Sequence, residues 1–259
     1  MGFRAQAKGN VPPGGPLAIA GLTIPSGVRL ISDYTGEVVG WMVKETPRTH
    51  ADLQQVVRVL AYYFPQTGLW PVVVYGDTDS DTELTLVGTS SDVGDDFDSE
   101  EFLLKAWWFS TLPEWETLTP EISSPFPKAA DLYLPASYAG KEPKGLILAP
   151  GTSPADALET LGWYCVHDNE LMGIGIARII QSWERRFHLT LVGMGETFMV
   201  FQPPVGGLDS HALAALNAEA LRIDPDESDE EDYPPDFVPS IPPHFLPIDE
   251  GKSLVTAEI

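Results

Sequence analysis

Apolar and polar positions along this chain follow the periods of both helices and strands. The clearest helical pattern lies at 49–64, where apolar residues recur every three or four positions. Thr49 or Asp52 can cap the beginning of that helix, and Pro65 and Gly68 are expected to end it. The other elements predicted in this half are strands within 17–32, a buried strand at 69–76, a strand at 83–88 and a helix at 98–109.

From residue 145 onward the elements alternate more regularly. Ser153 is a predicted N-cap with Pro154 at the first helical position. Gly195 and Glu196 stand between two apolar runs, as in a hairpin turn. The predicted elements are a strand at 145–150, helices at 153–163 and 171–187, strands at 189–195 and 197–204, and a helix at 208–223. This order indicates an α+β fold of mainly antiparallel sheets, with helices packed on one face.

Composition divides the chain into five parts, including two α+β lobes. The last part has eleven acidic residues, seven prolines and one lysine. Such a segment buries too little apolar surface to order itself, so we expect it to be disordered or peripheral. The parts are a flexible arm at 1–15, an N-terminal lobe at 16–110, a Pro-rich connection at 111–144, a C-terminal lobe at 145–223 and an acidic, Pro-rich tail at 224–259.

The formal net charge of −23 is unusual for 259 residues. Ten acidic residues and no Lys or Arg lie between 77 and 101, and the tail adds eleven more. This charge argues against binding to nucleic acid or to anionic membrane, because both need a basic protein surface. It permits a basic protein partner, and it equally suits solubility alone. The sequence predicts no particular oligomeric state.

Targeting signals and cysteine usage favour a cytoplasmic protein. The single cysteine, Cys165, excludes an intramolecular disulfide and gives no indication of secretion. The first 15 residues lack the apolar core of a signal peptide. No apolar run approaches the roughly 20 residues that a membrane span needs.

The densest stretch of the chain is RIIQSWERRFHLTLVGMGETFMVFQPP, at 178–204. On a helix, Trp183 and Phe187 fall on the apolar face and are predicted to be core. Glu184 and His188 stand four residues apart, which is the spacing of a helical pair. Arg186 lies beside the apolar face, so its guanidinium needs a buried acceptor or a route to water.

Two polar clusters contain residue types that bind metals, but neither has the spacing of a metal site. The cysteine and histidine of CVHDNEL, at 165–171, have no second pair at zinc-finger spacing, and a polar turn explains them. Three alternating aspartates in 77–88 begin like a calcium loop. There, Thr82 and Gly88 replace the Gly and Glu that such a loop requires. We therefore predict no metal site and no cofactor.

Three segments of the chain resemble a bacterial family, domain of unknown function 4253. They are ADALETLGW at 155–163, the helix and hairpin at 177–204, and AEALRIDPD at 218–226. His188 replaces the usual Gly of that family, Glu196 its hairpin Asp, and Ala220 and Asp224 a His and a Cys. The resemblance covers about residues 145–226 and implies a fold, not a reaction. The residues on the family pattern are Trp163, Asn169, Ser182, Trp183, Glu184, Arg186, Phe187, Gly195, Thr197, Pro203, Pro204, Glu219, Pro225 and Asp226.

Three interpretations of function remain open. We favour a non-enzymatic binding protein that engages a basic protein partner, with neutralisation of the partner, as by an immunity protein, as one version. The second is a small-ligand or enzymatic site near the 195–197 hairpin. The third is that Arg186 and Glu184 only hold the C-terminal lobe together. The candidate site residues are Arg186, Glu184, Asn169, Glu196, Trp163 and Ser182.

Overall fold

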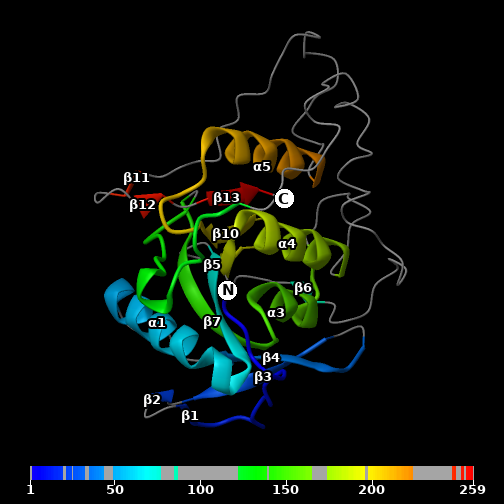
Figure 1. Cartoon of the computed structure of the whole chain (residues 1–259). Helices are drawn as coiled ribbons and strands as arrows, with labels where there is room; N and C mark the ends of the chain where they lie inside the picture. The colour runs from blue at the N-terminus through cyan, green and yellow to red at the C-terminus, as the bar shows by residue number, and fades with distance from the viewer. Residues whose placement is uncertain are drawn as a thin grey trace.

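A seven-stranded mixed sheet forms the centre of the computed structural model (Figure 1). Its strands are β3 (Gly27–Ile31), β4 (Val38–Val43), β5 (Leu69–Gly76), β7 (Glu142–Pro150), β9 (Thr190–Met194), β10 (Phe198–Gln202) and β13 (Val255–Glu258). Their spatial order is β13–β10–β9–β5–β7–β4–β3. All neighbours are antiparallel except β5 and β9, which run parallel. The α+β class with mainly antiparallel pairing is therefore confirmed.

The structure describes residues 2–19, 22–24, 26–32, 35–43, 49–76, 85–86, 122–138, 140–164, 174–195, 198–223, 247–248, 252–253 and 255–258. The predicted helix at 98–109 and the polar cluster at 165–171 lie outside these residues. Three further two-stranded sheets pair β1 (Leu17–Ile19) with β2 (Leu22–Ile24), β6 (Thr85–Leu86) with β8 (Trp163–Tyr164), and β11 (Pro247–Ile248) with β12 (Lys252–Ser253). A short 3-10 helix, η3, spans Ala129–Asp131.

The α-helices among the described residues are α1 (His50–Thr67), α3 (Pro154–Leu161), α4 (Ile174–Phe187) and α5 (Ser210–Ile223). The predicted caps are confirmed at α1, where the Thr49 side chain accepts from the Asp52 N–H at 3.1 Å. Ser153 caps α3 in the same way, with Pro154 in the first turn. The predicted end of α1 is confirmed at Gly68, which caps the helix with a left-handed backbone at φ of 62°, but not at Pro65. The helix continues to Thr67, because a proline in the last turn removes only one helical hydrogen bond.

Strands from both predicted lobes share one sheet and one core. β7, from the C-terminal part, lies between β4 and β5 of the N-terminal part, and β9 pairs with the other side of β5. Every residue of β5, β9 and β10 is buried, so both faces of the centre of the sheet are covered. The sequence predicts helices on one face only. In Figure 1, β5 and β7 pass between α1 on the left and α3 and α4 on the right.

The core contains the aromatic residues that the helical pattern places there. Trp183 and Phe187 of α4 are completely buried, as predicted. Trp183 lies edge-on to Phe201 of β10, with ring centroids 6.0 Å apart. Trp70 of β5 lies edge-on to Phe64 of α1 at 5.1 Å. These contacts join helices to strands that are distant in the sequence.

The N-terminal arm lies on the folded body and is not a free segment. The Ala5 N–H donates to the Thr152 carbonyl at 2.9 Å, and the Gly9 N–H donates to the Gly68 carbonyl at 2.8 Å. Phe3 packs against Trp70 with ring centroids 4.8 Å apart. The prediction of a flexible arm is therefore corrected: residues of this segment are bonded to, and packed on, the folded body. Composition alone does not reveal that the body offers acceptors and an aromatic ring to this segment.

Part of the predicted disordered tail belongs to the central sheet. β13 pairs with β10 in antiparallel register, from Phe198 opposite Glu258 to Phe201 opposite Val255. The strand covers the edge of β10 and so completes its hydrogen bonding. The sequence predicts a tail that is disordered or peripheral, and β13 takes a peripheral place at the edge of the sheet. Average acidity does not reveal that this short end of the tail pairs with a strand edge.

Candidate functional site

Helix α4 carries the charged residues that the sequence singles out, and they have different partners. Arg186 binds Glu219 of α5 and donates to Ser182 of its own helix, whereas Glu184 binds the beginning of α3 and the N-terminal arm. Residues two positions apart on a helix lie about 200° apart around its axis. Arg186 and Glu184 therefore belong to two separate polar contacts.

The first contact is a buried ion pair between Arg186 and Glu219 of α5. Arg186 Nη1 donates to Glu219 Oε1 at 2.9 Å, and Nη2 donates to Oε2 at 2.5 Å, which is the bidentate arrangement. The Trp183 indole N–H also donates to Glu219 Oε2, at 2.8 Å. Arg186 Nε donates to the Ser182 hydroxyl at 3.0 Å. The guanidinium thus finds the buried acceptor that its position on the helix requires.

The second contact surrounds Glu184, which is also buried. Its Oε2 accepts from the backbone N–H of Ala155, in the first turn of α3, at 3.2 Å. Its Oε1 accepts from Arg4 of the N-terminal arm. A carboxylate at the first turn of a helix is stabilised by the free N–H groups there. Glu184 therefore joins α4, α3 and the arm.

Burial determines the titration of Glu184. Removing the carboxylate from water raises its pKa, and the Arg4 charge and hydrogen bonds from Ala155 and Ser153 only partly offset this rise. A carboxyl with a raised pKa is a candidate proton-transfer group in an active site. Here its oxygens are engaged by Arg4 and Ala155, so its contacts are those of a structural group.

The predicted pair between Glu184 and His188 is replaced by other contacts. The helix ends at Phe187, and His188 has a left-handed backbone with φ of 52°. Its Nδ1 therefore turns to the Ser124 carbonyl, at 2.5 Å, and its ring stacks on Phe126 at 3.9 Å. The i,i+4 spacing applies only to residues that are both helical, which is why the sequence-based pairing fails.

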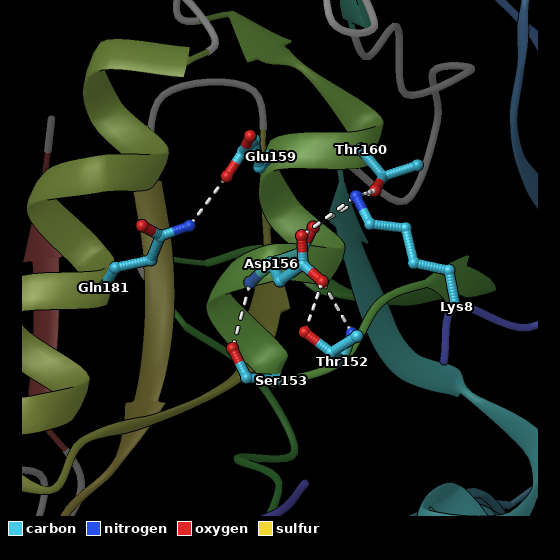
Figure 2. A network of polar contacts seen from close by, with 7 residues as sticks. All are labelled: Lys8, Thr152, Ser153, Asp156, Glu159, Thr160 and Gln181. Carbon is cyan, nitrogen blue, oxygen red and sulfur yellow. Dashed lines mark hydrogen bonds and ion pairs between the residues drawn. The ribbon is translucent and has the colours of Figure 1, made fainter. Parts of the chain in front are cut away.

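A third polar contact lies at the outer side of α3 (Figure 2). Lys8 of the arm binds Asp156 Oδ1 at 2.9 Å and the Thr160 hydroxyl at 2.9 Å. The Asp156 carboxylate also accepts from the Thr152 N–H at 2.6 Å and the Thr152 hydroxyl at 2.7 Å. Partial burial raises the pKa of Asp156, but these hydrogen bonds and Lys8 outweigh it and leave the pKa below its usual value. Figure 2 also shows Gln181 of α4 donating to Glu159 of α3 at 2.7 Å.

The remaining predicted site residues do not complete a common site. The Trp163 indole N–H donates to the Gly195 carbonyl at 3.1 Å and the side chain is fully buried. Asn169 and Glu196 lie outside the described residues. In the described part of the chain, no three His, Cys, Asp or Glu side chains gather closely enough to hold a metal ion. The described helices also include none long and apolar enough to cross a bilayer.

Sequence reasoning missed the partners of these groups. Glu219 is noted only because it lies on the family pattern, and Arg4 and Lys8 are assigned to a flexible arm. The one usable signal is the position of Arg186 beside the apolar face, which requires a buried acceptor. No comparable signal identifies Arg4, because a cation in a Gly- and Pro-rich terminal segment is ordinarily solvated.

No protein family, curated protein or solved structure matches this chain. The resemblance to domain of unknown function 4253 accordingly stays a prediction. The chemistry of the described residues is that of ion pairs and hydrogen bonds which join the arm, α3, α4 and α5.

Proposed function

We propose that this protein is a non-enzymatic binding protein whose acidic segments engage a basic protein partner. The observation that carries the proposal is the uneven distribution of charge. Residues 77–121 contain 13 Asp and Glu and one Lys, and residues 224–250 contain ten Asp and Glu and no Lys or Arg. The rest of the chain has 15 acidic and 14 basic residues. Nearly all of the net charge therefore belongs to two segments.

Several charged side chains of the body form contacts within the chain. Arg186, Glu219 and Glu184 are buried in contacts between helices, and Asp156 binds Lys8. These contacts join elements of the folded body to one another and to the N-terminal arm. Concentrated charge on separate segments accelerates the encounter with an oppositely charged partner and disfavours wrong ones.

The alternative of a small-ligand or enzymatic site has less support. Its central residues, Arg186 and Glu184, contact different elements and have their polar atoms engaged there. The binding proposal needs neither residue in a site, because it rests on the charge of residues 77–121 and 224–250.

The test is capture of partners by the full chain across a salt series, from about 0.05 to about 0.5 M. The matched variant carries D226N, E227Q, D229N, E230Q, E231Q and D232N, which remove six charges and leave the β13 residues intact. A second variant carries D95N, D96N, D98N, E100Q and E101Q. Truncation after α5 is unsuitable because it would delete a strand of the sheet.

We expect the full chain to capture a basic protein at low salt and to lose it at high salt. At least one neutralised variant should lose it at every salt concentration. Retention of the same partner by both variants, or capture that does not respond to salt, would contradict the proposal.

A further inference from the structure

The N-terminal arm lies on the body in the manner of a bound peptide. Residues 2–16 form neither helix nor strand, yet their backbone N–H groups donate to backbone carbonyls of the body at three points, from Ala5 to Thr152, from Gly9 to Gly68 and from Gly15 to Gly27. Main-chain hydrogen bonds combined with side-chain anchors are the usual means of holding a non-helical peptide on a protein surface. We call the surface that the arm covers the arm site, formed by Gly68, Trp70, Thr152, Asp156 and Glu184.

Three side chains of the arm supply the anchors. Phe3 packs on the Trp70 ring at a centroid distance of 4.8 Å. Arg4 binds the buried Glu184, and Lys8 binds Asp156 at 2.9 Å. Both arm cations remain nearly half exposed, at 46% and 44%. The arm site thus presents an aromatic surface and two carboxylates at fixed spacing.

A glycine completes the fit. A Cβ atom at Gly9 would lie 2.3 Å from the Thr67 carbonyl oxygen and 2.8 Å from the Gly68 carbonyl carbon. Both are backbone atoms at the end of α1, so making room for a Cβ atom would distort the end of that helix. The arm site therefore accepts a segment with an aromatic residue, then Arg, then Lys four positions later, followed directly by Gly.

We propose that the arm site is a binding site for a basic segment of a partner protein with this spacing, and that the N-terminal arm occupies it in cis. The proposal rests on the proposed function, because it assigns to the basic partner a place on the folded body. Charge complementarity supports this occupant, since the polar anchors of the site are two carboxylates.

Occupation in cis gives the arm a regulatory effect. A tethered segment has an effective concentration of about 1 mM, so a free peptide of equal affinity competes poorly. A partner that is already held by the acidic segments gains a comparable local concentration and can displace the arm. The arm then selects for partners that engage both the acidic segments and the arm site.

The test uses the full chain with Gly9→Ala, which displaces the arm sterically and removes no charge. The probe is the synthetic peptide GFRAQAKGN, residues 2–10, titrated by calorimetry into the variant and into the wild type. Control peptides carry Gln6→Ala, an exposed position, or Arg4→Ala together with Lys8→Ala. A second full-length variant, R4A/K8A, replaces Gly9→Ala if that chain does not fold.

We expect the peptide to bind the variant at least about tenfold more tightly than the wild type, whose own arm competes. The Gln6→Ala peptide should bind equally well, and the peptide lacking both cations at least about tenfold more weakly. Equal binding to variant and wild type, no binding to either, or indifference to the two cations would overturn the arm site.

A second measurement separates this inference from the proposed function. The basic partner captured through the acidic segments should bind Gly9→Ala more tightly than the wild type. Equal capture by both chains would overturn the arm site as its location and leave the proposed function intact. Peptide binding without capture of any basic partner would instead overturn the proposed function, and with it the assignment of a partner to this site.

Discussion

Two ion pairs on helix α4 use similar groups in different surroundings. Arg186 and Glu219 are both buried, with side chains 5% and 6% exposed. In the pair between Arg4 and Glu184 the carboxylate is 4% exposed but the cation is 46% exposed. In the first pair both charged groups are removed from water, whereas in the second pair Arg4 keeps much of its hydration.

This difference teaches how each pair can stabilise the fold. Desolvation of both charges is costly, so Arg186 and Glu219 need the bidentate geometry and the additional donor from Trp183. Glu184 is held chiefly by the N–H group of Ala155 and by an arm that reaches it from outside. The first pair joins α4 to α5, and the second joins α4 to the N-terminal arm.

The largest effect should come from breaking the buried pair. Glu219→Ala leaves the Arg186 guanidinium and the Trp183 N–H buried without their acceptor. We expect a loss of about 3 to 5 kcal/mol in the free energy of unfolding. Urea denaturation followed by tryptophan fluorescence measures it.

A double variant is the control for that prediction. Replacing both charges, with Arg186→Met and Glu219→Leu, removes the uncompensated cation, so most of the lost stability should return. If the double variant were as unstable as Glu219→Ala, the buried charges would not be the cause of the loss.

Breaking the pair between Arg4 and Glu184 should lower the free energy of unfolding by less. Arg4→Ala leaves Glu184 buried but keeps its bond from Ala155, so we expect a loss of about 1 to 2 kcal/mol. The pKa of Glu184 should rise further, because Arg4 is the largest influence that lowers it. Carboxyl ¹³C chemical shifts report that titration directly, and an unchanged pKa would show that Arg4 does not act on this carboxylate.

The two acids bound by the arm should respond to pH in opposite directions. The pKa of Glu184 is raised above 4.5 by burial, so its contribution to stability falls as the pH rises through the folded pKa. The pKa of Asp156 lies below 3.8, so its contribution is present above that value and is lost on acidification.

Denaturation of Glu184→Gln and Asp156→Asn between about pH 3 and about pH 8 tests the two signs. Relative to wild type, Glu184→Gln should gain stability with rising pH. The deficit of Asp156→Asn relative to wild type should shrink as the pH falls below 3.8. If the stabilities of the two variants changed with pH in the same way relative to wild type, the two causes would be refuted: burial for the shifted pKa of Glu184, and hydrogen bonding and ion pairing for that of Asp156.

The smallest effect belongs to Lys8. It is 44% exposed, and Asp156 keeps both hydrogen bonds from Thr152 when the lysine is removed. Lys8→Ala should therefore cost less than about 1 kcal/mol, and the cost should shrink with added salt. A loss as large as that of Arg4→Ala at high salt would mean that Lys8 acts through packing, not charge.

Local signals in the sequence predict most of the described elements. Thr49 and Ser153 cap α1 and α3 as expected, and Trp183 and Phe187 are core. These successes depend on periodicity and on capping, which act within a few residues. For the candidate site, the sequence predicts that Arg186 needs a buried acceptor but does not identify it, because Glu219 is 33 residues away and on another helix.

The sequence by itself determined the described α-helices, most of the described strands, the caps at Thr49 and Ser153, the α+β class and the concentration of negative charge in two segments. Only the tertiary structure decided that β7 enters between β4 and β5, that β13 covers the edge of β10, and that Arg4 reaches Glu184. The physical reason is the separation along the chain over which each interaction acts. Propensity and capping act between neighbours along the chain, whereas strand order and charge pairing depend on which distant surfaces are desolvated together.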